Sequence, residues 1–121
     1  MKFDETRPIY IQIMENLKSK IARGELKPGD KLPSVRELSG KIGVNPNTIA
    51  RAYSELEREG VIMTRRGQGT YVTDDPRKVT EIREEMAASA LSTFLESLRA
   101  LGLSRDEILS LIAKNLEEDE R

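Results

Sequence analysis

The strongest constraint on the fold is a pair of short helical patterns joined by a very tight turn. Residues 34–37 read Ser-Val-Arg-Glu, the pattern that caps a helix start, and Gly43 suits the left-handed residue that ends it. The Asn-Pro pair at 45–46 then marks the start of a second helix, which ends near Gly60. Two short helices across so tight a turn indicate a helix-turn-helix.

The flanking patterns extend this motif on both sides. Aliphatic residues recur at every fourth position from residue 9 to 21, which predicts an amphipathic helix. After the pair, residues 61–72 form two short β-prone runs around Gly67-Gln68-Gly69, a hairpin pattern. We therefore predict a mainly α fold with a small β-hairpin (α+β), in which residues 1–75 form a winged helix-turn-helix DNA-binding domain.

The segment 76–121 reads as a short helical tail that follows a break at Thr-Asp-Asp-Pro, residues 73–76. It contains one long apolar stripe, then Gly102, then a second capping pattern at 104–107. Two amphipathic helices cannot enclose a core of their own, so we expect them to pair with a second chain. The alternative is that they fold back on their own winged helix. The residues expected to form the dimerisation surface are Ile82, Met86, Ala90, Phe94, Leu98, Leu101, Ile108, Leu111, Ile112 and Leu116.

The composition argues against most enzymes and metal proteins. The chain of 121 residues has neither cysteine nor histidine, which removes thiolate nucleophiles, the usual zinc sites and histidine acid–base catalysis. We expect no catalytic residue, no metal and no cofactor. The sequence has no apolar run near the roughly 20 residues that span a bilayer, and its N-terminus lacks an apolar signal core. These features predict a cytoplasmic protein with no membrane partner.

The charge is unevenly distributed along the chain. The net charge is −1, yet residues 1–75 carry 13 Lys and Arg against 11 Asp and Glu, whereas residues 76–121 carry 7 against 10. This weakly indicates a nucleic-acid-facing first part, although a chance fluctuation among solvated charges would give the same pattern. DNA binding depends on the local potential at the contact surface rather than on the total charge.

The second helix of the pair begins with side chains suited to DNA. In a helix-turn-helix this helix enters the major groove, and its first residues contact base edges. Asparagine can pair with adenine through two hydrogen bonds, and threonine can contact a base or the thymine methyl group. Two alternatives stay open: Asn45 could serve only as a cap, and Arg51 could be a solvated surface charge. The candidate contacts here are Asn45, Asn47, Thr48 and Arg51.

Two further groups complete the candidate DNA surface. Arg36, with Ser34 beside it, lies at the start of the first helix of the pair, which crosses the phosphate backbone in this geometry. The alternative for Arg36 is an ion pair with Glu55 or Glu57. The hairpin tip places arginines next to glycines, which permit close approach to a groove or a phosphate. The candidate wing residues are Arg65, Arg66, Gly67, Gln68 and Gly69.

The block PGDKLPSVRELSGKIGVNPNTIARAYSELEREGVIMTRRGQGTYV, residues 28–72, closely resembles the DNA-binding domain of the GntR family of bacterial transcription regulators. With RPIYIQI at 7–13 the resemblance covers residues 7–73. It implies operator binding as a homodimer, with contacts from the second helix, from Arg36 and from the wing tip between Arg66 and Gly69. The chain lacks the histidines that one larger subfamily uses for metal.

The short tail resembles that of the YtrA-type subfamily. This likeness implies a tail that mainly dimerises and regulated genes that often encode ABC transporters. We therefore expect a repressor that binds a pseudo-palindromic operator and controls a transporter operon. The sequence leaves room for a small-molecule effector between tail and winged helix but names none. A competing interpretation, from another class, is a winged helix that binds protein instead of double-stranded DNA.

Overall fold

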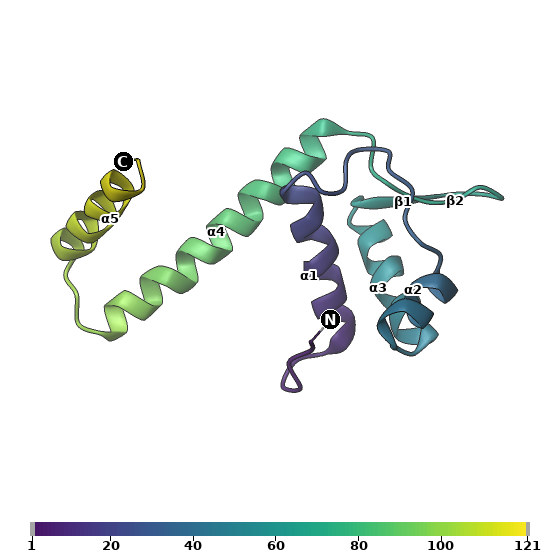
Figure 1. The fold of residues 1–121 in the computed structure, drawn as a ribbon, viewed down its shortest axis with the longest axis horizontal. Coiled ribbons are helices and arrows are strands. Elements are labelled where there is room, and N and C mark those ends of the chain that lie inside the picture. The colour runs from purple at the N-terminus through teal and green to yellow at the C-terminus, as the bar shows by residue number, and fades with distance from the viewer. Residues whose placement is uncertain (1, 121) are drawn as a thin grey trace. The chain divides into compact units, whose positions relative to one another are not determined.

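In the computed structural model, which describes residues 2–120, the chain forms two compact units that divide within a long helix, between residues 85 and 86. The predicted fold class, mainly α with one small hairpin, is confirmed. The predicted functional boundary at residue 75 stays a prediction. In chain order the elements are α1 (Ile9–Ala22), α2 (Val35–Ile42), α3 (Pro46–Arg58), β1 (Ile62–Arg65), β2 (Gly69–Val72), α4 (Pro76–Ala100) and α5 (Arg105–Asp119) (Figure 1).

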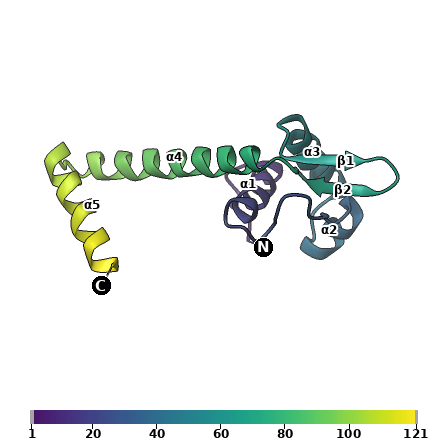
Figure 2. The same ribbon diagram turned by 90° about the horizontal axis from the view of Figure 1, so that it is seen from above.

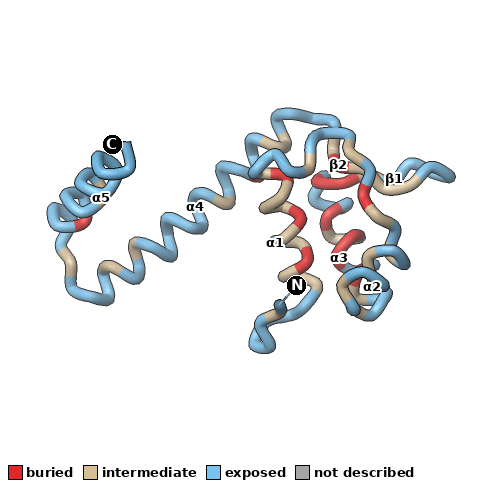
Figure 3. Tube along the Cα trace, viewed as in Figure 1, coloured by how far each residue is buried: buried red, intermediate tan, exposed pale blue. Residues whose placement is uncertain are grey.

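The first unit is organised around α3, which contacts α1, α2 and strand β1 (Figure 1). The side of α3 formed by Ile49, Ala52 and Leu56 is completely buried. Figure 3 shows buried positions on α1, on α3 and in the hairpin. The core of this unit is mostly aliphatic. Its members are Ile13, Leu17, Ile21, Leu32, Ile49, Ala52, Tyr53, Leu56, Val61, Ile62, Val72 and Ile82.

The helix caps form as the sequence predicts. The Ser34 hydroxyl accepts a hydrogen bond from the Glu37 amide at 3.1 Å, and the Glu37 carboxylate accepts one from the Ser34 amide at 3.3 Å. Gly43, with φ of 69°, adopts the left-handed conformation that ends α2. Ser104 and Glu107 make the same reciprocal pair at α5, and those hydrogen bonds hold the pKa of the Glu107 carboxyl below its usual value.

The hairpin is antiparallel, with Ile62 opposite Val72 and Arg65 opposite Gly69 (Figure 2). The segment before α2 also pairs with β2. The Leu32 amide donates to the Thr70 carbonyl at 2.8 Å, and the Val72 amide donates to a carbonyl in the same segment at 2.8 Å. Residues 30–32 therefore cover the outer edge of β2, which explains why Leu32 is 3% exposed.

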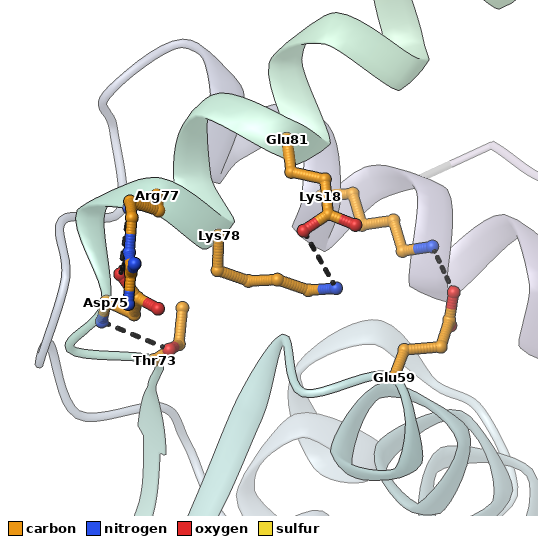
Figure 4. Close-up of polar contacts among 7 residues, drawn as sticks. All are labelled: Lys18, Glu59, Thr73, Asp75, Arg77, Lys78 and Glu81. Carbon is orange, nitrogen blue, oxygen red and sulfur yellow. Dashed lines mark hydrogen bonds and ion pairs between the residues drawn. The ribbon is translucent and has the colours of Figure 1, made fainter.

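The segment 73–76, where the sequence indicates a break, is a hydrogen-bonded start to α4 (Figure 4). The Asp75 carboxylate accepts from the Arg77 amide at 2.9 Å, and the Thr73 hydroxyl accepts from the Asp75 amide at 3.2 Å. Further along α4, Ile82 is 2% exposed and the Arg83 guanidinium donates to a carbonyl of α1 at 3.0 Å. The first turns of α4 thus belong to the winged-helix unit.

The second unit consists of the rest of α4, a tight turn and α5. Gly102, with φ of 84°, supplies the positive φ of the turn between them, and the Leu103 amide donates to the Leu98 carbonyl at 3.3 Å. Ile108 is the buried residue of α5, at 6% exposure. Across residues 2–120 no helix combines the length and apolarity needed to cross a membrane.

The buried phenol of Tyr53 makes stability depend on alkaline pH. Its hydroxyl donates to the Pro33 carbonyl at 2.7 Å, and burial, with a contribution from Glu37, raises the pKa of Tyr53 to about 12. The unfolded phenol ionises near pH 10, so the unfolded chain loses its proton first. The free energy of unfolding should therefore be unaffected by this group below pH ~10 and should fall by about 2–3 kcal/mol as pH rises to ~12.

Urea unfolding at about pH 9 and about pH 11 checks this expectation against the Tyr53→Phe variant, which cannot ionise. The native protein should lose about 1 kcal/mol more than the variant between these two pH values. An equal loss in both proteins would contradict the assignment.

Candidate nucleic-acid interface

The start of α3 presents three polar side chains that differ in how they are used. The Asn45 side-chain oxygen accepts a hydrogen bond from the Asn47 amide at 2.8 Å, so Asn45 does cap the helix. Asn47 is exposed and Thr48 half-buried, and neither side chain has a hydrogen-bond partner within residues 2–120. Three groups are therefore left available for an outside partner: the side chains of Asn47 and Thr48, and the Asn45 side-chain NH2.

Arg51, one turn further along α3, is held by an aromatic ring. Its guanidinium lies 4.0 Å from the ring centroid of Tyr10 and donates to the Tyr10 hydroxyl at 3.4 Å. This stacking combines cation–π attraction with a fixed orientation of an otherwise flexible side chain. Arg51 is thus exposed but oriented by α1, which the sequence alternatives, a DNA contact or a solvated charge, did not include.

Arg36 lies in the first turn of α2 with its side chain exposed and without an ion pair or hydrogen bond to residues 2–120. The alternative ion pair with Glu55 or Glu57 does not form. Glu55 pairs with Arg58, and Glu57 accepts a hydrogen bond from a β1 threonine at 3.2 Å. Ser34 differs from Arg36, because its hydroxyl is already engaged in the cap of α2.

The two arginines near the hairpin tip lie in different environments. The Arg65 guanidinium lies 4.6 Å from the Tyr71 ring centroid and 3.4 Å from an Asp74 carboxylate oxygen. Arg66 is exposed and has no ion-pair partner among residues 2–120. Gly67 has φ of 75°, and the following residue, Gln68, donates its amide to the Arg65 carbonyl at 2.9 Å. The wing therefore offers one paired and one unpaired arginine.

Lys31 is a wing residue that sequence reasoning missed. It pairs with Tyr71 across the outer edge of β2. Its side chain passes so close to Gly69 that a Cβ at that position would lie 3.0 Å from the lysine Cε. Gly69 also has φ of 128°, so a side chain there would be strained as well as crowded. The only sequence signal was a lysine before Leu-Pro-Ser, because the pairing with Tyr71 exists only in the folded sheet.

Several acidic groups of this unit are neutralised within it. Lys18 reaches Glu59 at 2.8 Å (Figure 4), and Arg58 pairs with Glu55. By contrast Lys31, Arg36 and Arg66 lack ion-pair partners within residues 2–120. No group of acidic side chains in that range is placed to hold a metal ion. The arrangement can supply cations and hydrogen-bond donors to an anionic partner.

Comparison with known proteins identifies this arrangement. The model for bacterial regulatory proteins of the gntR family matches residues 9–72. The HTH-type transcriptional repressor YtrA of Bacillus subtilis is 51% identical over 85 residues, which cover 65% of each chain. A GntR family transcriptional regulator from Listeria monocytogenes has a TM-score of 0.85 at 40% identity, covering 93% of this chain and 98% of that one.

Similar structures include complexes with operator DNA. The AraR DNA-binding domain in complex with operator ORX1 has a TM-score of 0.53 at 32% identity, covering 60% of this chain and 89% of that one. The likeness therefore extends to a protein that was solved on its operator.

The cap at Asn45 can be separated from any outside contact by two substitutions. Asn45→Ala removes the side-chain acceptor and should lower the free energy of unfolding by about 1 kcal/mol, whereas Asn45→Ser keeps an acceptor and should stay within about 0.5 kcal/mol of the native protein. Urea denaturation measures both. Equal loss of stability in both variants would contradict a stabilising role for the side-chain acceptor at residue 45.

Proposed function

The chain belongs to the gntR family of bacterial regulatory proteins, and on that premise we propose that it is a repressor that binds a pseudo-palindromic operator as a homodimer. It is a transcriptional regulator with a DNA-binding fold, and its relatives are regulators rather than enzymes. The proposal of operator binding rests on a set of unpaired polar side chains on the winged helix: Arg36, Asn47, Thr48 and Arg66.

The roles of these side chains follow from the geometry of a helix-turn-helix on DNA. The start of α3 enters the major groove, where Asn47 and Thr48 contact base edges. Arg36, on the helix that crosses the backbone, binds a phosphate, and Arg66 at the wing tip binds the minor groove or a phosphate. Arg51 and Arg65 join them as oriented cations, since each is stacked on a tyrosine. Lys31 adds a phosphate contact beside the wing.

The remaining predicted contacts keep smaller roles. Asn45 uses its oxygen for the cap, which leaves its NH2 group for DNA. Ser34 fixes the start of α2, and its exposed position allows its hydroxyl to approach a phosphate. Gly67 and Gly69 keep the wing tip free of side chains that would hold the backbone away from the duplex, and Gln68 lies exposed between them.

Dimerisation is supported by the apolar surface of the second unit. Residues 86–120 form two helices, and within this range Ile108 is the single buried residue. Large apolar side chains that stay exposed on so small a unit favour association, because association removes them from water. Ile82, also expected in this surface, is buried in the core of the first unit and has no part in the proposed interface. The large exposed apolar residues are Leu91, Phe94, Leu101, Leu109, Leu111 and Leu116.

The remaining members of the predicted surface fit the same proposal. Met86, Leu98 and Ile112 are half-buried, and Ala90 is exposed. Leu91 and Leu109 extend the surface beyond the sequence prediction, since they are 53% and 52% exposed. A two-fold pair of such units would present two recognition helices about 34 Å apart, to match an operator of two half-sites.

The biological setting is proposed from the relatives. Repression follows from the likeness to the repressor YtrA, and control of a transporter operon follows from the subfamily resemblance. A regulator of chromosomal DNA acts in the cytoplasm. A small-molecule effector would adjust the operator affinity. A winged helix that binds protein instead of DNA would not give salt-dependent operator binding, and this difference decides between the two functions.

Replacement of Arg36 or Arg66 by alanine should weaken operator binding without unfolding the protein, because neither side chain is engaged within residues 2–120. Each variant should lose about tenfold in affinity and reduce the slope of log K against log salt by about 1. Fluorescence anisotropy measures both quantities, using DNA from upstream of the protein's own gene and a scrambled duplex at several salt concentrations.

The matched control is Arg77→Ala, which removes the same charge from the same unit at an exposed position on α4. Its affinity should stay within about twofold of the native protein. If Arg77→Ala and Arg36→Ala weakened binding equally, general electrostatics would account for the effect and the specific contact would be refuted.

Phe94→Glu should convert the dimer to a monomer, because it places a charge on an exposed apolar surface that the proposed interface would bury. Ser92→Glu, on an exposed position of the same helix, supplies the same charge as a control. Sedimentation velocity at micromolar concentration should show a dimer for the native protein and Ser92→Glu, and a monomer for Phe94→Glu. A native monomer would refute the proposed dimer.

A further inference from the structure

A cavity of about 390 Å³ lies inside the winged-helix unit, between α1, α2 and the segment that joins them. Its volume falls within the range of small-molecule sites, which hold roughly 300–1,000 Å³. Seven of its ten lining residues are apolar, so the wall of the cavity is mainly hydrophobic. The apolar residues that line it are Ile13, Leu17, Leu26, Leu32, Pro33, Leu38 and Ile42.

The cavity exists because α2 is poorly packed. Its sequence is amphipathic, yet none of its eight residues is buried. Leu38 and Ile42, on its apolar side, are only half-buried and face the cavity. Helix α2 contacts α3 but does not close onto α1. The apolar side of a helix in a native core is usually covered, so this side is available to an occupant.

Three polar side chains border the same cavity, and two of them are cationic. Lys20 lies in the last turn of α1, and Lys41 lies in the last turn of α2. Asn16 lies one turn before Lys20. Neither lysine has an ion-pair partner within residues 2–120, and the Asn16 amide has no hydrogen-bond partner there. Two unpaired cations beside an apolar chamber complement an anion with an apolar body.

We propose that this cavity binds a small amphipathic carboxylate, with its hydrocarbon body against Leu26, Leu38 and Ile42 and its carboxylate between Lys20 and Lys41. The Asn16 amide donates the remaining hydrogen bond. Because Leu38 and Lys41 share one short helix with Arg36, the occupant touches the helix that the proposed function assigns to the DNA backbone. The binding itself does not rest on the proposed function, although its regulatory consequence does.

The test uses sodium octanoate as the probe and the protein of 121 residues without DNA. Two-dimensional ¹H–¹⁵N NMR spectra, recorded during a titration to about 10 mM, should show saturable shifts confined to residues that line the cavity, with a dissociation constant on the order of 1 mM. Octanamide, which is neutral and of similar size, should bind about tenfold more weakly, because the charge-assisted hydrogen bonds to the lysines are lost.

Three variants test whether octanoate binds in this cavity. The double variant Lys20→Met with Lys41→Met keeps the aliphatic stems and should bind octanoate about tenfold more weakly. Leu38→Phe should weaken octanoate and octanamide alike by filling the chamber. Lys114→Met, which removes the same charge from α5, should leave the affinity unchanged.

Equal affinity for octanoate and octanamide would overturn the proposal. So would shifts that saturate on the exposed leucines of α4 and α5, or that never saturate. Each of these outcomes is independent of DNA binding, which is measured separately with Arg36→Ala, so failure of the cavity proposal is distinguishable from failure of the proposed function.

Discussion

The packing of one side of α3 is the interaction on which the rest of the structure depends. Ile49, Ala52 and Leu56 have no exposed surface, and they join α3 to α1, to α2 and to the first strand of the hairpin. Because a helix that is buried along one side must present its other side to solvent, this packing also decides which polar residues remain exposed. Asn47 and Arg51 are exposed for the same reason that Ile49 is buried.

This chain can present a cationic surface despite its net negative charge, because folding pairs some of its charges and leaves others exposed. Carboxylates on the later turns of α3 are occupied by Lys18 and Arg58. Tyr10 holds Arg51 without neutralising it, since a ring orients a cation and adds no opposite charge. The local potential then reflects the side chains left unpaired and not the net charge of −1.

Apolar side chains are left incompletely buried at two places in the chain. In the second unit, leucines such as Leu101 and Leu116 stay in water, and a second copy of the chain would cover them. In the first unit, the apolar side of α2 borders a chamber flanked by lysines, which suits a small anion better than a flat protein surface. The two places therefore differ in shape and in the charge beside them, which is why we propose a different occupant for each.

The sequence alone determined the helices, their caps, the hairpin and the buried side of α3, because capping pairs, positive-φ glycines and apolar periodicity act over a few residues. It also identified Arg36, Asn47 and Arg66 as exposed candidates. The tertiary structure alone decided the stacking of Arg51 on Tyr10, the place of Lys31 beside the wing, the capped start of α4 and the burial of Ile82. These depend on which distant segments meet, and periodicity within one helix carries no information about the partner that its apolar side will find.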